Sequence, residues 1–233
     1  MTKPLIVAHR GASKAERENT TEAFRTAKRM GADMVELDVR RTADNVLIVH
    51  HDALIEGVPI KDMRADSLPA YVPTLEAALD ACQGMDVNVE IKNIEGEPDY
   101  DPDQMVAGQV VTLLNTRGDH DRMLISCFDR ETVNAVRKLD PTLRTGYLVV
   151  KPEPARGRTL ADYATSIADE GHVAIHPHKR YVTPELVAVA HAVGLAVNVW
   201  TVDKPDQLKS LAALGVDALI TNVPDTARTV LFG

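Results

Sequence analysis

The 233-residue sequence has only two cysteines, Cys82 and Cys127, and neither lies at a metal-binding spacing from other ligands. Two isolated thiols cannot build the disulfide framework of a small secreted domain, and they match no zinc motif. We therefore expect two buried, free thiols in a reducing compartment, and hence a cytoplasmic protein.

Long apolar runs and an excess of positive charge are also missing. No stretch approaches the roughly 20 apolar residues of a membrane-spanning helix, and the run PLIVA before His9 is too short for a signal-peptide core. The formal net charge is −8 at pH 7, whereas surfaces that bind nucleic acid are basic. We expect no nucleic-acid partner, no secretory leader and no stable membrane association.

Short apolar runs rich in β-branched residues alternate with longer helical patterns, within an ordinary composition of 45% hydrophobic and 26% charged residues. The runs predict nine strands, at 5–9, 34–39, 46–50, 87–92, 123–128, 143–149, 172–176, 196–202 and 218–221. Helices are predicted at 20–30, 73–82, 129–139, 183–193 and 204–214.

The predicted helices have recognisable ends. Asn19 precedes the first helix and is interpreted as its N-cap, with Glu22 three residues further on. Gly31, Gly194 and Gly215 follow helix ends, where a left-handed glycine often closes the last turn.

Nine strands are one too many for an eightfold barrel, and the segment RRTADN after residue 39 accounts for the extra one. Six residues cannot form a parallel crossover, which takes a dozen or more, but they suit a hairpin with its turn at 43–45. Strand 46–50 then returns antiparallel, and eight parallel strands remain. We predict a single-domain α/β fold over 1–233, a (β/α)₈ TIM barrel with a β-hairpin extension after strand two. The alternative, an open doubly wound sheet, would need a glycine-rich loop after strand one, which HRGASKAE is not.

Charged and aromatic residues gather at the carboxyl ends of the predicted strands, where a TIM barrel has its active site. Residues two apart in a strand leave on the same face, so Glu36 and Asp38 are expected to point together into the barrel mouth. Glu90 and Lys92 repeat this arrangement on the next parallel strand. The full set at this rim is His9, Arg10, Glu36, Asp38, His51, Asp52, Glu90, Lys92 and Trp200.

Three of these side chains, Glu36, Asp38 and Glu90, are carboxylates that would repel one another if buried without compensation. Three oxygen ligands suit a hard divalent cation, Mg²⁺ or Ca²⁺, whereas zinc would recruit the histidines as direct ligands. Because charged pairs on two neighbouring strands face inward, we favour a metal site. The alternative is a salt-bridge network of the carboxylates with Arg10, Arg40 and Lys92.

His9 and His51 are expected at the same rim, and two imidazoles can divide acid and base roles at neutral pH. Arg10 and Lys92 beside a metal suit a phosphate anion. His176 and His178 can face the mouth, but we expect no direct catalytic role for them. The other histidines are interpreted as structural, namely His50, His120, His172 and His191.

The motifs HRG, ENT, EAF, GADMVELDV, RTADNVLIVHHD, VPTLEAAL, VNVEIKN and NVWTVD follow one another between about residues 5 and 225. In this combination the sequence resembles the glycerophosphodiester phosphodiesterase family, (β/α)₈ barrels that cleave glycerophosphodiesters to glycerol 3-phosphate and an alcohol, usually with a bound divalent metal. The resemblance implies an acid/base pair, His9 and His51, and the metal ligands Glu36, Asp38 and Glu90. It further implies substrate-binding roles for Arg10, Lys92, Glu18 and Trp200; as an alternative, Trp200 is a core aromatic residue that caps the barrel.

In this interpretation one histidine deprotonates the attacking group and the other protonates the departing alcohol. Attack by the glycerol 2-hydroxyl and attack by water both stay open. Two rival functions are a lysophospholipase D-like lipid phosphodiesterase and a barrel that binds phosphodiesters without turnover. Secreted members of the first group usually bring a signal peptide and disulfides, and we expect neither in this sequence. The second would lack a catalytic group, and none is missing here, so we favour a hydrolase of soluble glycerophosphodiesters.

Three features depart from the family pattern. Segment 53–72 is short where many members have a larger insert that covers the active site, so we expect a more open mouth. The frequent aspartate after the last strand is Asn222 here, and the frequent asparagine after WTV is Asp203. We expect neither residue to contact the predicted catalytic set.

Overall fold

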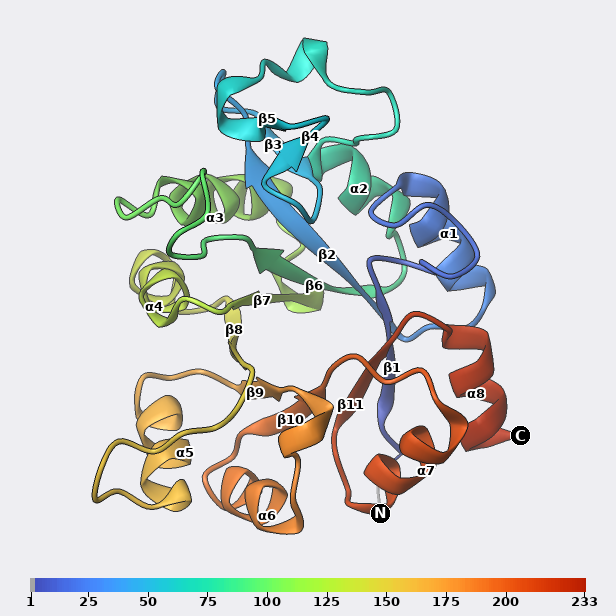
Figure 1. The fold of residues 1–233 in the computed structure, drawn as a ribbon, viewed down its shortest axis with the longest axis vertical. Helices are drawn as coiled ribbons and strands as arrows, with labels where there is room; N and C mark the ends of the chain where they lie inside the picture. Colours follow the sequence, from blue (N-terminus) through green and yellow to red (C-terminus); the bar gives the residue numbers. More distant parts are fainter. Residues whose placement is uncertain (1–2) are drawn as a thin grey trace.

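The computed structural model describes residues 3–233; Met1 and Thr2, on which the expectation of no secretory leader partly rests, lie outside this range. Eight parallel strands surround a central axis (Figure 1). They run in chain order around the ring, and β1 pairs with both β2 and β11, which closes it. The predicted TIM barrel is confirmed. Its strands are β1 (Leu5–His9), β2 (Met34–Arg41), β6 (Asp86–Ile91), β7 (Met123–Cys127), β8 (Arg144–Val149), β9 (Ala174–Pro177), β10 (Ala196–Val199) and β11 (Ala218–Thr221).

The predicted hairpin extension is present. β3 (Leu47–Val49) pairs antiparallel with β2, with Val39 opposite Val49. Asn45 in the turn has the left-handed φ of 63° that such tight turns require. The hairpin returns the chain to the carboxyl end of the barrel, and this places His51 near the end of β2.

Segment 53–72 forms a small layer on this hairpin, at the top of Figure 1. β4 (Leu54–Ile55) and β5 (Val58–Pro59) pair with each other, and two 3₁₀ turns follow at Ile60–Asp62 and Ala65–Ser67. Ile48 of β3 forms a buried cluster with Ile55 and Ile60. The segment is therefore anchored to the hairpin by apolar contacts.

Helices cover the outside of the barrel (Figure 1). The sequence did not predict α3, α5 or α8. α3 is rich in valine and contains Gly108, and both residue types weaken a helix signal. Within residues 3–233 the helices are α1 (Thr21–Arg29), α2 (Leu75–Ala81), α3 (Met105–Arg117), α4 (Arg130–Leu139), α5 (Leu160–Asp169), α6 (Pro184–Ala192), α7 (Pro205–Ala213) and α8 (Pro224–Phe232).

One predicted helix boundary is wrong. The N-cap of α1 is Thr20, whose hydroxyl accepts a hydrogen bond from the backbone N–H of Ala23 at 3.2 Å. Asn19 is one residue too early, has a φ of 56° and turns its side chain toward Asp38. A polar capping residue does precede α1, but it is Thr20, because the Asn19 side chain hydrogen-bonds to Asp38 instead.

The outward-facing residues of the strands pack against the helices, as Val35, Leu37 and Val39 do on β2. Cys82 and Cys127 are free and buried, and burial raises the pKa of each thiol to about 12. Among the helices described here, none has the length and apolar character needed to cross a bilayer.

Candidate active site

The HRG motif makes a sharp turn at the end of β1. Arg10 and Gly11 have left-handed φ values of 55° and 80°. A Cβ atom at position 11 would lie 2.7 Å from the Cβ of Ala23, so the contact of this turn with α1 requires glycine. The backbone N–H of Arg10 donates to Glu36 Oε2 at 2.9 Å. This contact fixes the turn against β2 and keeps Arg10 at the barrel mouth.

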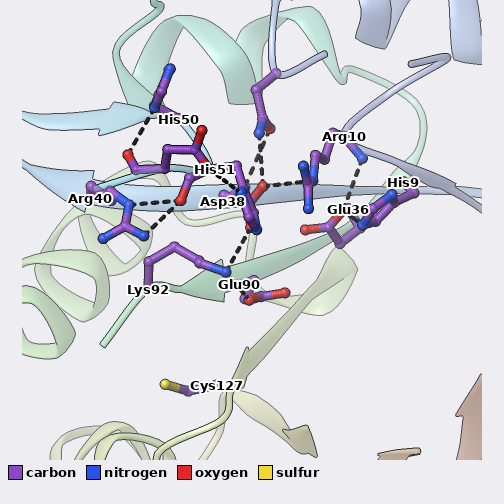
Figure 2. A network of polar contacts seen from close by, with 12 residues as sticks. His9, Arg10, Glu36, Asp38, Arg40, His50, His51, Glu90, Lys92 and Cys127 are labelled. Atoms are coloured by element: carbon purple, nitrogen blue, oxygen red, sulfur yellow. Dashed lines mark hydrogen bonds and ion pairs between the residues drawn. The ribbon is translucent and has the colours of Figure 1, made fainter. Parts of the chain in front are cut away.

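Glu36, Asp38 and Glu90 meet at the centre of the mouth (Figure 2). Asp38 on β2 stands opposite Glu90 on β6 in the strand register. One carboxylate oxygen from each residue can be chosen so that all three lie within 4.8 Å of one another. All three side chains are buried, so the expected convergence of the carboxylates is present.

Part of the alternative salt-bridge network is present as well. Lys92 Nζ lies 2.9 Å from Glu90 Oε1 and 3.6 Å from Asp38 Oδ1. Arg10 Nε lies 3.2 Å from Asp38 Oδ2, and the Asn19 amide donates to the same oxygen at 2.8 Å. Two cations thus face three carboxylates.

The third carboxylate, Glu36, is only partly compensated. Its Oε2 accepts from the backbone N–H of Arg10, but its buried Oε1 has no hydrogen-bond partner among residues 3–233. Burial, with Asp38 and Glu90 nearby, raises the pKa of Glu36 well above its usual value. Burial and Asp38 also raise the pKa of Glu90 to about 6. At Asp38 burial opposes ionisation, but Lys92 and Arg10 outweigh it and lower the pKa. The unpaired oxygen and the surplus negative charge fit a bound divalent cation.

Each predicted catalytic histidine has one ring nitrogen held by an oxygen. His9 Nδ1 lies 2.7 Å from Asn222 Oδ1, and its Nε2 lies 4.0 Å from Glu36 Oε2. His51 Nδ1 lies 2.7 Å from Asp52 Oδ1. Burial lowers the pKa of both imidazoles. A nitrogen fixed in this way as an N–H donor leaves Nε2 as the proton acceptor.

The expectation that Asn222 stands apart from the catalytic set is wrong, whereas Asp203 is linked to His9 only through Asn222 in the described chain. Asn222 Nδ2 donates to Asp203 Oδ2 at 2.7 Å, and its backbone N–H donates to Asp203 Oδ1 at 2.8 Å. These bonds turn Asn222 Oδ1 toward His9. The cause is barrel closure: β1 and β11 are neighbours, so the residue after β11 lies beside the end of β1.

Most of the predicted site residues line a single cavity of about 250 Å³, smaller than a pocket for a drug-sized ligand. Asp38 is buried and is not part of the lining. Glu18 lies at the rim, where it pairs with Arg10 Nη1 at 2.9 Å. The predicted residues in the lining are His9, Arg10, Glu36, His51, Glu90, Lys92 and Trp200; those that sequence reasoning missed are Asn88, Ile94, Glu97, Phe128, Leu148 and Ile220.

One wall of the cavity is aromatic. The Trp200 indole N–H donates to the backbone oxygen of His176 at 2.7 Å, and its ring stands edge-on to Phe128 with centroids 5.5 Å apart. Within the described chain, segment 53–72 contributes no residue to the lining. A larger groove of about 1030 Å³ lies on the outside along α3, but its lining in residues 3–233 includes no histidine and no arginine.

A second polar group lies deeper in the barrel. The His176 side chain is fully buried; its Nε2 accepts from the Asn198 amide at 3.0 Å, and it lies so close to Gly146 that a Cβ there would clash with it. Burial lowers the pKa of His176 to about 3. The imidazole is therefore neutral in the native state at the pH of the cell.

This burial predicts a pH dependence of stability. Between pH 6.5 and 3 the unfolded chain binds a proton at His176 that the native chain does not, so stability falls as pH falls through this window. From pH 7 to pH 5 the loss from this residue is about 2 kcal/mol. We expect His176→Gln to be less sensitive to pH by that amount, measured as the free energy of unfolding in urea. Equal slopes in the two proteins would contradict the neutral, buried imidazole.

Sequence comparison relates this chain to one family of known proteins. The sequence model of the glycerophosphoryl diester phosphodiesterase family matches residues 9–226. A glycerophosphodiester phosphodiesterase of Caldanaerobacter subterraneus subsp. tengcongensis is 28% identical over 96% of this chain and 96% of its own. The Bacillus subtilis enzyme of the same name is 29% identical, over 98% of this chain and 87% of its own. An Oleispira antarctica phosphodiesterase, solved in complex with the product sn-glycerol-3-phosphate, has the same fold with a TM-score of 0.88 and 22% identity, over 99% and 98% of the two chains.

Proposed function

The chain belongs to the glycerophosphoryl diester phosphodiesterase family, and from this premise we propose that its site hydrolyses glycerophosphodiesters to glycerol 3-phosphate and an alcohol. The protein is an enzyme, a phosphoric diester hydrolase. One observation carries the proposal for the site: two imidazoles, three carboxylates and two cations converge at a cavity of about 250 Å³.

Glu36, Asp38 and Glu90 would hold a divalent cation, Mg²⁺ or Ca²⁺. When bound, such an ion polarises a phosphate oxygen and lowers the pKa of a hydroxyl group beside it. With the carboxylates compensated, Lys92 and Arg10 can turn their N–H donors to phosphate oxygens, with which they form charge-assisted hydrogen bonds. The uncompensated oxygen of Glu36 supports this arrangement.

His9 and His51 divide the proton transfers. Each presents Nε2 to the cavity because its Nδ1 is held by Asn222 or Asp52. One imidazole removes the proton of the attacking hydroxyl, from glycerol or from water, and the other gives a proton to the departing alcohol oxygen. If the glycerol 2-hydroxyl attacks, this step gives a cyclic phosphate, which water then opens to glycerol 3-phosphate with the two histidine roles reversed. Trp200 would contact the substrate from one side of the cavity. Glu18 would orient Arg10 through their ion pair.

A coupled assay tests the proposed reaction. Purified protein with Mg²⁺ or Ca²⁺ is expected to release glycerol 3-phosphate from glycerophosphocholine, glycerophosphoethanolamine and glycerophosphoglycerol. The relative rates on these substrates show which alcohol group the enzyme prefers. Release of free glycerol together with a phosphoalcohol would place the cleaved bond on the other side of phosphorus and refute the proposed reaction.

The contact between Asn222 and His9 gives a second prediction. Asn222→Leu keeps the size of the side chain but removes the acceptor for His9 Nδ1, so the imidazole loses its fixed orientation. We expect kcat to fall about ten-fold or more, together with a lower melting temperature, because Asp203 Oδ2 also loses its donor. The matched control is Asn115→Leu, a substitution within α3 on the outside of the barrel, which is expected to leave kcat unchanged.

We also propose that the enzyme works in a reducing compartment, the cytoplasm. The support is the state of its two cysteines, which are free, buried and held as thiols by their raised pKa values. Such thiols neither crosslink the fold nor react readily.

A further inference from the structure

Arg40 lies two residues beyond Asp38 on β2, and so on the same face of the strand as Glu36 and Asp38. It nevertheless takes no part in the carboxylate cluster, contrary to the alternative that the sequence left open. Its side chain has 0% exposure. A buried guanidinium is tolerated only with partners for its charge and its donors, so its partners indicate its role.

All five N–H donors of the guanidinium find acceptors. Nε and Nη2 donate to the backbone oxygen of His51 at 2.9 and 2.7 Å (Figure 2). Nη1 donates to the two carboxylate oxygens of Asp99, each at 2.7 Å, and Nη2 also donates to Glu97 at 2.7 Å. The side chain thus joins two segments that the barrel sheet does not join.

The first segment carries His51. β3 ends at Val49, so His51 lies beyond the last strand pairing. In the part of the chain that the structure describes, the only hydrogen bonds to the His51 backbone oxygen come from Arg40. The imidazole is 33% exposed, and its one side-chain hydrogen bond within residues 3–233 is to Asp52. The position of this histidine therefore depends on the guanidinium beneath its backbone.

The second segment is the connection from β6 to α3, residues 92–104. It begins at Lys92, and Ile94 and Glu97 from it line the cavity. Arg40 holds it at Glu97 and at Asp99, whose side chain is only 7% exposed. One buried cation therefore fixes this cavity-lining connection relative to His51.

We infer that Arg40 is a positioning residue for the reaction, which acts by setting the place of His51 relative to the substrate and to the 92–104 connection. This inference rests on the proposed role of His51. A guanidinium suits the task because its rigid planar fork binds a carbonyl oxygen and two carboxylates at once, whereas an ammonium is a single compact charge.

A double-mutant cycle tests this role, with kcat measured on glycerophosphocholine for Arg40→Lys, His51→Ala and the double variant. Lysine keeps a charge beside Glu97 and Asp99 but cannot also hold the His51 oxygen. We expect Arg40→Lys to lower kcat about 10- to 100-fold, the scale of a misplaced catalytic group. In the His51→Ala background the same change should alter kcat less than about two-fold.

The control is Arg41→Lys, the next residue on β2 but on the opposite face, where Nη1 contacts Asn45 Oδ1 at 2.6 Å; its kcat should equal that of the wild type. If Arg40→Lys does not fold, Asp99→Asn takes its place in the cycle. That variant keeps the guanidinium but weakens its ion pair with residue 99. We expect kcat to fall about three-fold when His51 is present and to stay unchanged in the His51→Ala background.

The outcomes are distinct. An equal loss in both backgrounds, or no loss from Arg40→Lys, overturns the inference and leaves the proposed function intact. Wild-type kcat in His51→Ala alone removes the proposed role of His51 and, with it, the inference about Arg40. A loss of kcat in the Arg41→Lys control as large as that in Arg40→Lys would indicate a general effect of substitutions on β2 and would also overturn the inference.

Discussion

Replacement of His51 or His9 by alanine is expected to lower kcat by about 10²- to 10⁴-fold, the usual contribution of a general acid or base. Both imidazoles line the cavity, and each has Nδ1 engaged by an oxygen so that Nε2 is left for proton transfer. Because an acid or base acts in the chemical step, the loss should appear in kcat. Glycerol 3-phosphate release at saturating substrate measures it.

The chain has a matched control for His51 in its neighbour. His50 Nδ1 contacts the backbone oxygen of Asp52 at 2.9 Å, and His50 is absent from the cavity lining of the described residues. His50→Ala is therefore expected to retain a kcat within about two-fold of the wild type. Near-wild-type kcat in both His9→Ala and His51→Ala would rule out the two-histidine mechanism.

Removal of divalent metal is expected to lower the rate at least about 100-fold, because Glu36 Oε1 has no hydrogen-bond partner among the described residues and Lys92 and Arg10 are the two cations that face three carboxylates. Chelation with EDTA, followed by added Mg²⁺ or Ca²⁺ in excess, should abolish and then restore activity. A rate that chelation leaves unchanged would show that the carboxylates are compensated by Arg10 and Lys92 alone.

Binding of the ion can be followed without turnover. An ion at 100 times its dissociation constant stabilises the native state by about 2.7 kcal/mol, which corresponds to a rise of about 5–10 °C in melting temperature for a chain of this size. We expect Glu36→Gln to lose most of this rise. Glu131→Gln, a change at an exposed position on α4, should keep it. An equal rise in both variants would place the ion elsewhere.

Much of the fold could be predicted because its signals are local. The period of two in β2 fixed the common facing of Glu36 and Asp38, and the same rule on β6 fixed Glu90. A connection of six residues sufficed to identify the hairpin, since chain length alone forbids a parallel crossover. Gly31, Gly194 and Gly215 have the left-handed φ values of 78°, 81° and 83° that their places after helices predicted.

Two of the errors have the same physical origin. Asn19 was interpreted as a helix cap because its residue type and position allow it, but its amide binds Asp38 at 2.8 Å. Asn222 was set aside although it lies 2.7 Å from His9, 213 residues earlier in the chain. In both cases the deciding partner comes from a distant segment that only the closed ring brings near.

By itself, then, the sequence determined which side chains face the barrel mouth, because side chains alternate between the two faces of a strand. The residue types at those positions determined the kind of chemistry that the site can perform. Only the tertiary structure decided which of these groups touch: the acceptor for His9, the surplus charge on Glu36 and the partners of Arg40. Those choices depend on ring closure and on the paths of connections after the strands, where contacts at 3 Å or less join residues that no local pattern relates.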